Sequence, residues 1–107
     1  MNTKEFLMGL PSKVDPAALE GLETNFHFII SKDNGDPEEI SIEVKDGEIQ
    51  AQQGLHGDPR CTVRASDENL SKLLKGELNP MMAILTGKLK ISNQGEMLKY
   101  AKLFGLM

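Results

Sequence analysis

Apolar and polar residues alternate with a period of two through much of the first two thirds of the chain. The alternation runs over residues 25–31 and again over residues 38–52, where the dipeptide Asp46-Gly47 interrupts it. This dipeptide between alternating segments is the strongest short-range signal of a β-hairpin. The pattern predicts a sheet with one polar face and one apolar face that other elements must cover.

Two further segments, residues 60–66 and 88–92, alternate in the same way. Helical spacing and capping residues predict five short helices over residues 4–10, 16–20, 68–75, 80–85 and 94–107. The last four follow expected N-caps, which are Asp15, Ser66, Asn79 and Asn93. Pro11 is expected to end the first helix. This order of elements predicts an α+β fold with helices over one face of a mixed or mostly antiparallel sheet.

Length and composition narrow the class of protein. With 107 residues, 39% of them hydrophobic and 26% charged, the chain is expected to form one globular domain over residues 1–107. Its formal net charge is −4 and its Lys and Arg residues are scattered, which argues against nucleic-acid binding. A single cysteine, no signal-peptide pattern and no long apolar run favour a cytoplasmic protein.

Residues that carry catalysis or bind metals are sparse. His27 and His56 are the two imidazoles, and neither stands in a motif that would pair it with a nucleophile. Together with Cys61 they lack the spacing of zinc ligands, and no phosphate-binding loop is present. The sequence therefore predicts no catalytic residue, no metal site and no cofactor. An esterase or thioesterase would depend on His56, and this alternative stays open.

Methionine and leucine are concentrated in the last third of the chain. Four of the five methionines after the first residue lie there, at positions 81, 82, 97 and 107. Methionine is flexible and fills irregular space, so it suits either a packed core or a pocket for ligands of varied shape. Helical spacing alone does not separate these two interpretations.

Three stretches of the sequence resemble the sterol carrier protein 2 family of lipid-carrier domains. They are GLPSKVDPAALEGLETNFHFII, DGEIQAQQG and, most specifically, DPRCTVRASDENLSKLLKGELNPMMAILTGKLKI. The resemblance covers nearly the whole chain, from about Phe6 to Phe104, in order and without large gaps. It implies a five-stranded, mostly antiparallel mixed sheet covered on one face by helices, with lipid in a hydrophobic tunnel between them.

The resemblance also implies which residues line that tunnel. They are Phe26, Phe28, Ile40 and Ile42 on the strands, and Leu74, Met81, Met82, Leu85, Met97, Leu98, Ala101 and Phe104 on the helices. Two departures from the family bear on the ligand. The letters of a peroxisomal signal occur at residues 101–103 but not at the end of the chain, and the N-terminal helical region is short, as in prokaryotic members. These departures favour a fatty acyl chain, an acyl-thioester or a phospholipid over a sterol.

The expected function is non-catalytic binding and transfer of a hydrophobic lipid, which is a fatty acyl chain, an acyl-thioester, a phospholipid or a sterol-like lipid. Transient membrane contact is expected, with a monomer or homodimer as the working form. A rigid apolar void of about 300 Å³ would cost roughly 7 kcal/mol. The tunnel is therefore expected to be filled with lipid or closed by flexible methionine side chains. The alternative is a protein-interaction or dimerisation module, which covers the same apolar face with a second copy and binds no lipid.

Overall fold

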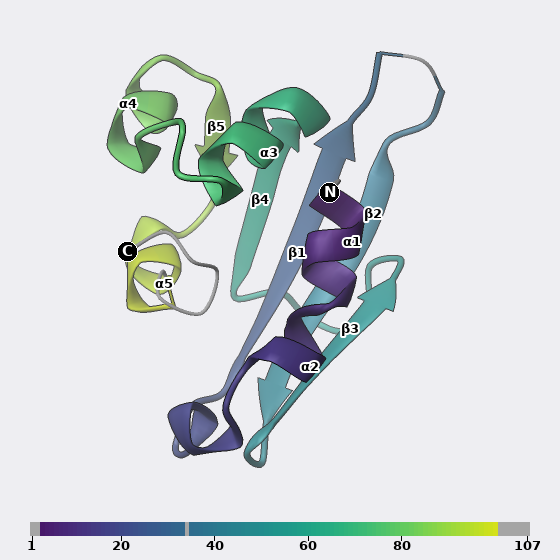
Figure 1. Ribbon diagram of the computed structural model, residues 1–107, viewed down its shortest axis with the longest axis vertical. Helices are drawn as coiled ribbons and strands as arrows, with labels where there is room; N and C mark the ends of the chain where they lie inside the picture. The colour runs from purple at the N-terminus through teal and green to yellow at the C-terminus, as the bar shows by residue number, and fades with distance from the viewer. Residues whose placement is uncertain (1–2, 34, 101–107) are drawn as a thin grey trace.

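The central feature of the fold is a five-stranded sheet with the strand order β3-β2-β1-β4-β5 (Figure 1). The computed structural model describes residues 3–33 and 35–100. In chain order the strands are β1 (Thr24–Ser31), β2 (Glu38–Lys45), β3 (Glu48–Gln53), β4 (Cys61–Ser66) and β5 (Leu89–Ile91). Neighbouring strands are antiparallel except for β1 and β4, which are parallel. The predicted α+β fold with a mixed, mostly antiparallel sheet is confirmed.

The hairpin between β2 and β3 is set by the turn at Asp46 and Gly47. Both residues have positive φ, 54° and 75° respectively. Two-residue turns of this conformation match the twist of the flanking strands and need residues that tolerate the left-handed region. The turn puts Val44 opposite Ile49, so apolar side chains of both strands share one face.

The helices α1 to α5 cover the apolar face of the sheet (Figure 1). The helical elements are α1 (Thr3–Met8), α2 (Leu10–Lys13), the 3₁₀ helix η1 (Pro16–Leu19), α3 (Asp67–Leu74), α4 (Pro80–Leu85) and α5 (Gln94–Lys99). α1 contacts β2 and α2 contacts β3, whereas α3 packs on β1 and β4, α4 on β5 and α5 on β4. The core fills the space between the two layers with buried apolar side chains from both.

The predicted N-caps form, but one predicted helix end does not. Asp15, Ser66, Asn79 and Asn93 each accept a hydrogen bond from a backbone N–H in the first turn of the helix that follows. The prediction that Pro11 ends the first helix is wrong, since Pro11 lies in the first turn of α2. Proline suits that position because its fixed φ is helical and the N–H that it lacks has no helical partner there.

The second face of the sheet is polar, and the loop between β3 and β4 folds over part of it. Ser41 Oγ donates to the Gly54 carbonyl over 2.6 Å and accepts from the His56 amide over 2.8 Å. Asn25 Nδ2 donates to the His56 carbonyl over 2.9 Å, and the Arg60 amide donates to the Asn25 carbonyl over 2.8 Å. These bonds pair backbone groups of the loop with the polar residues that it buries.

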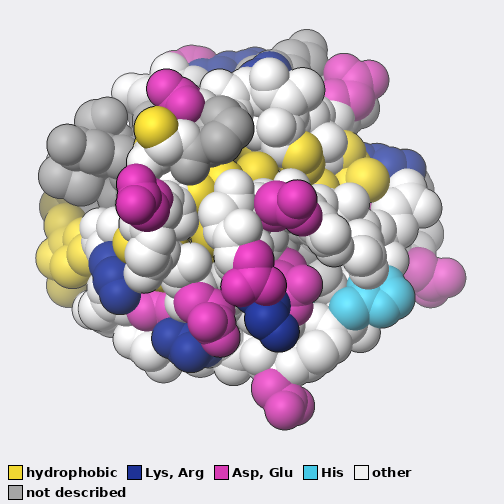
Figure 2. All heavy atoms as spheres, turned by 90° about the horizontal axis from the view of Figure 1, so that it is seen from below, with side chains coloured by type: hydrophobic (Ala, Val, Ile, Leu, Met, Phe, Trp, Pro, Cys, Tyr) yellow, Lys and Arg dark blue, Asp and Glu magenta, His cyan; other side chains and the backbone are white. Residues whose placement is uncertain are grey.

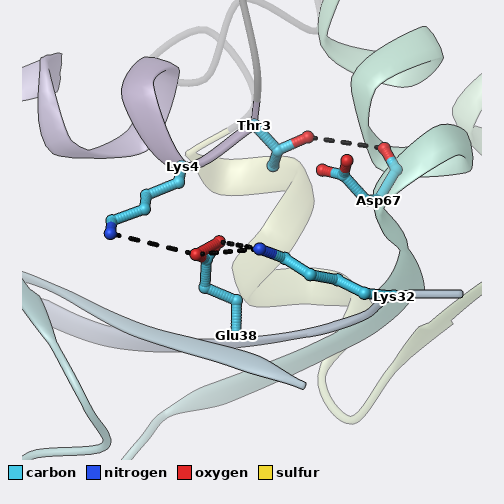
Figure 3. Close-up of polar contacts among 5 residues, drawn as sticks. All are labelled: Thr3, Lys4, Lys32, Glu38 and Asp67. Carbon is cyan, nitrogen blue, oxygen red and sulfur yellow. Dashed lines mark hydrogen bonds and ion pairs between the residues drawn. The ribbon is translucent and has the colours of Figure 1, made fainter. Parts of the chain in front are cut away.

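Polar contacts tie the start of α1 to one end of the sheet (Figure 3). Glu38, at the beginning of β2, pairs with Lys32 over 3.2 Å and with Lys4 of α1 over 3.9 Å. Thr3 Oγ1 donates to the Asp67 carbonyl at the beginning of α3 over 3.4 Å. Exposed ion pairs contribute about 0–1 kcal/mol each. These contacts therefore orient α1, while apolar burial supplies most of the stability.

Candidate functional site

The floor of the candidate site is the covered face of the two central strands. Phe26 of β1 pairs with Ile42 of β2, and Phe28 pairs with Ile40. The two phenyl rings stack with their centroids 6.1 Å apart. Alternation along both strands puts these four side chains on one face. The structure thus brings together the four strand residues that the resemblance assigns to the site.

This floor is closed. Phe26, Ile40 and Ile42 are each 0% exposed. A water-sized hollow beside a side chain would leave that side chain some accessible surface, so these three pack directly against their neighbours. A lipid chain reaches them only if the side chains or helices above them move.

Met97 and Tyr100 are the residues by which α5 packs against the core. Both are buried, and the Tyr100 ring meets Phe26 edge to face with centroids 5.8 Å apart. The Tyr100 hydroxyl donates to the Glu23 carbonyl over 3.2 Å. Leu98, which the resemblance assigns to the tunnel, is 58% exposed and does not share the buried side of α5 with Met97. Residues three apart lie on the same side of a helix, which is why Tyr100 takes this role.

Three predicted site residues on α4 lie at the surface. Met81, Met82 and Leu85 are 53%, 54% and 76% exposed, whereas Ala83 is fully buried. Positions i, i+1 and i+4 share one side of a helix, and on this six-residue helix that side points away from the core. Periodicity could not reveal this, because a short helix of apolar residues has no polar side to mark its outer face. Contact of these residues with a ligand stays a prediction.

Half-buried apolar side chains on α4 and in the segment before it pack against the core. Leu74 at the end of α3 packs against the core, as do Leu78 and Ile84. Ile84 directly precedes the exposed Leu85 on α4. α4 therefore carries both a half-buried apolar side chain that packs against the core and apolar side chains that are exposed. The remaining predicted site residues, Ala101 and Phe104, lie outside the described residues.

On the polar face of the sheet, the imidazole ring of His27 contacts the backbone of His56. His27 Nε2 lies 2.8 Å from the His56 carbonyl, and His56 Nε2 lies 2.8 Å from the Gln53 carbonyl. A ring nitrogen that faces a carbonyl must carry the proton, so both rings use this donor to hold the loop between β3 and β4. Sequence spacing did not show the contact, because the two histidines are 29 residues apart. Both rings anchor the loop on the face opposite the candidate floor.

Cys61 lies on the covered face and is chemically quiet. It is fully buried, and its thiol donates to the Asn93 carbonyl over 3.5 Å. Burial raises the pKa of the Cys61 thiol above its ordinary value of 9.0. A thiol that stays protonated at neutral pH is a poor nucleophile. Within residues 3–33 and 35–100, no group of three or more His, Cys, Asp or Glu residues is placed to hold a metal ion.

One family model accounts for almost the full length of the chain. The SCP-2 sterol transfer family matches residues 4–107. The chain belongs to this family. The resemblance carried by the three stretches quoted above is thereby confirmed. No protein of curated function matches the chain significantly in sequence.

Solved SCP-2 domains share the fold. The sterol carrier protein domain 2 of Helicoverpa armigera is 26% identical with a TM-score of 0.75, and the match covers 94% of this chain and 81% of that one. The palmitated sterol carrier protein 2-like 2 of Aedes aegypti is 19% identical with a TM-score of 0.75, and the match covers 97% of this chain and 95% of that one. At such low identity the second likeness shows the fold alone.

A larger enzyme contains a similar fold. A stereoselective inverting sec-alkylsulfatase from Pseudomonas sp. is 19% identical with a TM-score of 0.78, and the match covers 100% of this chain. The chain spans 16% of that enzyme, so the likeness is to one part of it and concerns the fold. None of the helices described for this SCP-2 domain is long and apolar enough to cross a membrane.

Proposed function

We propose that this protein binds and transfers a lipid whose acyl chain lies between the sheet and its covering helices. The observation that carries the proposal is the apolar floor formed by Phe26, Phe28, Ile40 and Ile42. Membership of the SCP-2 sterol transfer family supports a lipid as the ligand. The palmitated relative supports an acyl chain, so the ligand class is a fatty acid, an acyl-thioester or a phospholipid.

Burial of the acyl chain supplies the affinity. A chain of about 16 carbons gains roughly 12 kcal/mol on leaving water, at about 0.8 kcal/mol per CH₂. Little of this is lost on transfer from a bilayer to an apolar protein interior, because both environments exclude water. Opening of the closed floor then limits transfer, since packed side chains must separate first.

We assign the opening to α4 and α5. α4 buries one side chain, Ala83, and exposes Met81, Met82 and Leu85. α5 buries Met97 and the Tyr100 that directly follows the helix, and α3 buries Leu70 and Leu73. A helix with few buried apolar contacts separates from the core at low free-energy cost. The opened site would be lined by the strand residues together with Leu74, Met81, Met82, Leu85, Met97, Leu98, Ala101 and Phe104.

The proposal assigns no catalysis to the chain. His27 and His56 each direct Nε2 at a backbone carbonyl, and Cys61 is buried with a raised thiol pKa. An esterase or thioesterase needs a nucleophile and a base placed together beside the substrate. Both imidazoles lie on the polar face of the sheet, away from the floor that would hold the acyl chain.

Binding of a fluorescent fatty acid tests the proposal. The wild type is expected to bind it saturably, and unlabelled palmitate should displace it. Met82→Arg should weaken binding about tenfold, because the chain must pass a charge that resists desolvation. Met82 is 54% exposed, so the fold should tolerate the change.

Glu43→Gln on the polar face is the matched control, since Glu43 is exposed and lies on β2 away from the floor. It should bind the fatty acid like the wild type. Equal affinities of Met82→Arg and Glu43→Gln would contradict the placement of the opening. A wild type without saturable binding would overturn the proposed function itself.

A further inference from the structure

Most of the exposed large hydrophobic side chains of the described residues lie on α4 and α5. Four of the five belong to these helices, Met81, Met82, Leu85 and Leu98, and they form what we call the apolar patch. Figure 2 shows one group of hydrophobic side chains at the left edge, the side on which Figure 1 draws α4 and α5, and others in the middle of the view. Single exposed apolar side chains are ordinary, but a group of them at one side of a molecule marks an interaction surface.

Formal charge is divided unevenly along the chain, and the apolar patch lies in the basic part. Residues 70–107 hold six lysines and two glutamates, a net charge of +4. Residues 1–69 hold six basic and fourteen acidic residues, a net charge of −8. Each part holds six basic residues, so the difference in net charge comes from the acidic residues, fourteen against two. Exposed Lys75 and Glu77 precede α4, exposed Lys88 follows it, and exposed Lys99 directly follows Leu98, so in sequence three lysines and one glutamate lie beside the residues of the patch.

From these observations we infer that the apolar patch is the surface by which the protein docks on membranes that contain anionic lipids. Protruding apolar side chains insert at the interface of a bilayer, and lysines beside them are attracted to anionic headgroups. The anionic headgroups repel the acidic part of the chain, so the protein approaches the bilayer with α4 facing it. The inference builds on the proposed lipid transfer, because α4 is also part of the proposed opening.

A bilayer fits the apolar patch better than a second copy of the chain does. A stable protein–protein interface takes roughly 20–30 residues from each side, whereas four exposed apolar side chains make up the patch. A second copy would also bring its own lysines against those of the first, and like charges oppose association. A bilayer accepts a few apolar anchors and supplies the opposite charge.

Vesicle co-sedimentation tests this docking surface. The probes are phosphatidylcholine vesicles and vesicles that also contain phosphatidylserine, each at low and high salt. We expect the wild type to prefer the anionic vesicles and to lose that preference at high salt, because screening weakens exposed charge interactions. Leu85→Asp should weaken binding about tenfold, since it removes an apolar anchor. Lys88→Glu should weaken it roughly fivefold or more, from the effect of one lysine near an anionic surface.

Lys45→Glu is the matched control, because Lys45 is an exposed lysine in the acidic part of the chain. It makes the same charge change as Lys88→Glu and should bind vesicles like the wild type. Equal losses in Lys88→Glu and Lys45→Glu would overturn the inference, as would a wild type that ignores both kinds of vesicle. A concentration-dependent dimer that Leu85→Asp abolishes, without vesicle binding, would overturn it in favour of a second copy.

Fatty-acid binding without vesicles separates this inference from the proposed function. Lys88→Glu should bind the fluorescent fatty acid like the wild type while docking poorly. A wild type that binds the fatty acid but no vesicles overturns the docking surface alone. A wild type that docks through the patch but binds no fatty acid overturns the proposed function alone.

Discussion

Cys61 illustrates how burial sets the chemistry of a single side chain. It pairs with Phe26 across the parallel strands, on the covered face of the sheet, and it is fully buried. Removal from water disfavours the thiolate and raises the pKa of the Cys61 thiol, and the nearby Glu96 carboxylate adds to the rise. The thiol therefore behaves as a small apolar side chain of the core.

We expect this thiol to make the fold less stable at alkaline pH. In the unfolded chain Cys61 titrates near its ordinary value of 9.0, and in the folded chain the pKa is higher. The contribution of the protonated thiol to stability is complete below about pH 9 and is lost as the pH rises from there through the native pKa. Urea denaturation from neutral to alkaline pH should show a falling free energy of unfolding, with a smaller fall in Cys61→Val. Parallel declines in the two proteins would contradict this assignment.

Hydrogen bonds add to the buried Met97 and Tyr100 in attaching α5 to the sheet. Thr24 Oγ1 donates a hydrogen bond to the Glu96 carboxylate, and the Tyr100 hydroxyl donates to the Glu23 carbonyl. Asn93 accepts from the Glu96 amide as the predicted cap, while the Glu96 carboxylate turns to Thr24. Loss of one of these hydrogen bonds would therefore weaken the attachment of α5 to the sheet.

Thr24→Val should loosen α5 and speed lipid exchange. Valine keeps the volume and strand propensity of threonine but removes the donor to Glu96, at a cost of about 1 kcal/mol. If the opening involves α5, the dissociation rate of a bound fluorescent fatty acid should rise about fivefold, as stopped-flow displacement would measure. Thr62→Val makes the same substitution on the polar face of β4, opposite the face that α5 covers, and should leave the rate unchanged. Equal rates in the two variants would count against α5 as part of the opening.

The molecule as a whole divides into a firmly packed part and a loosely covered part. The sheet and α3 contribute most of the large buried side chains, whereas α4 and α5 expose Met81, Met82, Leu85 and Leu98. The charge division follows the same line, because α4 and α5 lie in the basic part of the chain. One side of the domain thus combines weak packing, exposed apolar surface and positive charge, which suits both lipid uptake and membrane docking.

Added palmitate should stabilise the whole molecule. A ligand present at 100 times its Kd stabilises the folded state by about 2.7 kcal/mol. For a domain of this size the Tm should then rise by roughly 10–20 °C in a thermal scan. Native mass spectrometry should show the matching adduct. Butyrate carries the same carboxylate on a short chain and should leave the Tm unchanged. An unchanged Tm with palmitate, or an equal rise with butyrate, would contradict burial of the acyl chain.

Local signals in the sequence were enough for much of the fold. The Asp46-Gly47 turn and the alternation on either side of it predicted the β2–β3 hairpin, and Asn79 predicted the start of α4. Such signals depend on residues within one turn or one strand pair, so no distant contact alters them. Pro11 was misassigned because proline is compatible both with a helix end and with a first helical turn.

The sequence alone was sufficient for the apolar face of each strand, the caps of the helices and the family. Only the tertiary structure decided that α4 turns Met82 outward, that Tyr100 packs on Phe26, and that His27 meets His56. The physical reason lies in the range of the interactions. Strand alternation and capping are fixed by neighbours a few residues away, whereas the outer face of a short apolar helix is fixed by whichever distant element covers its other side.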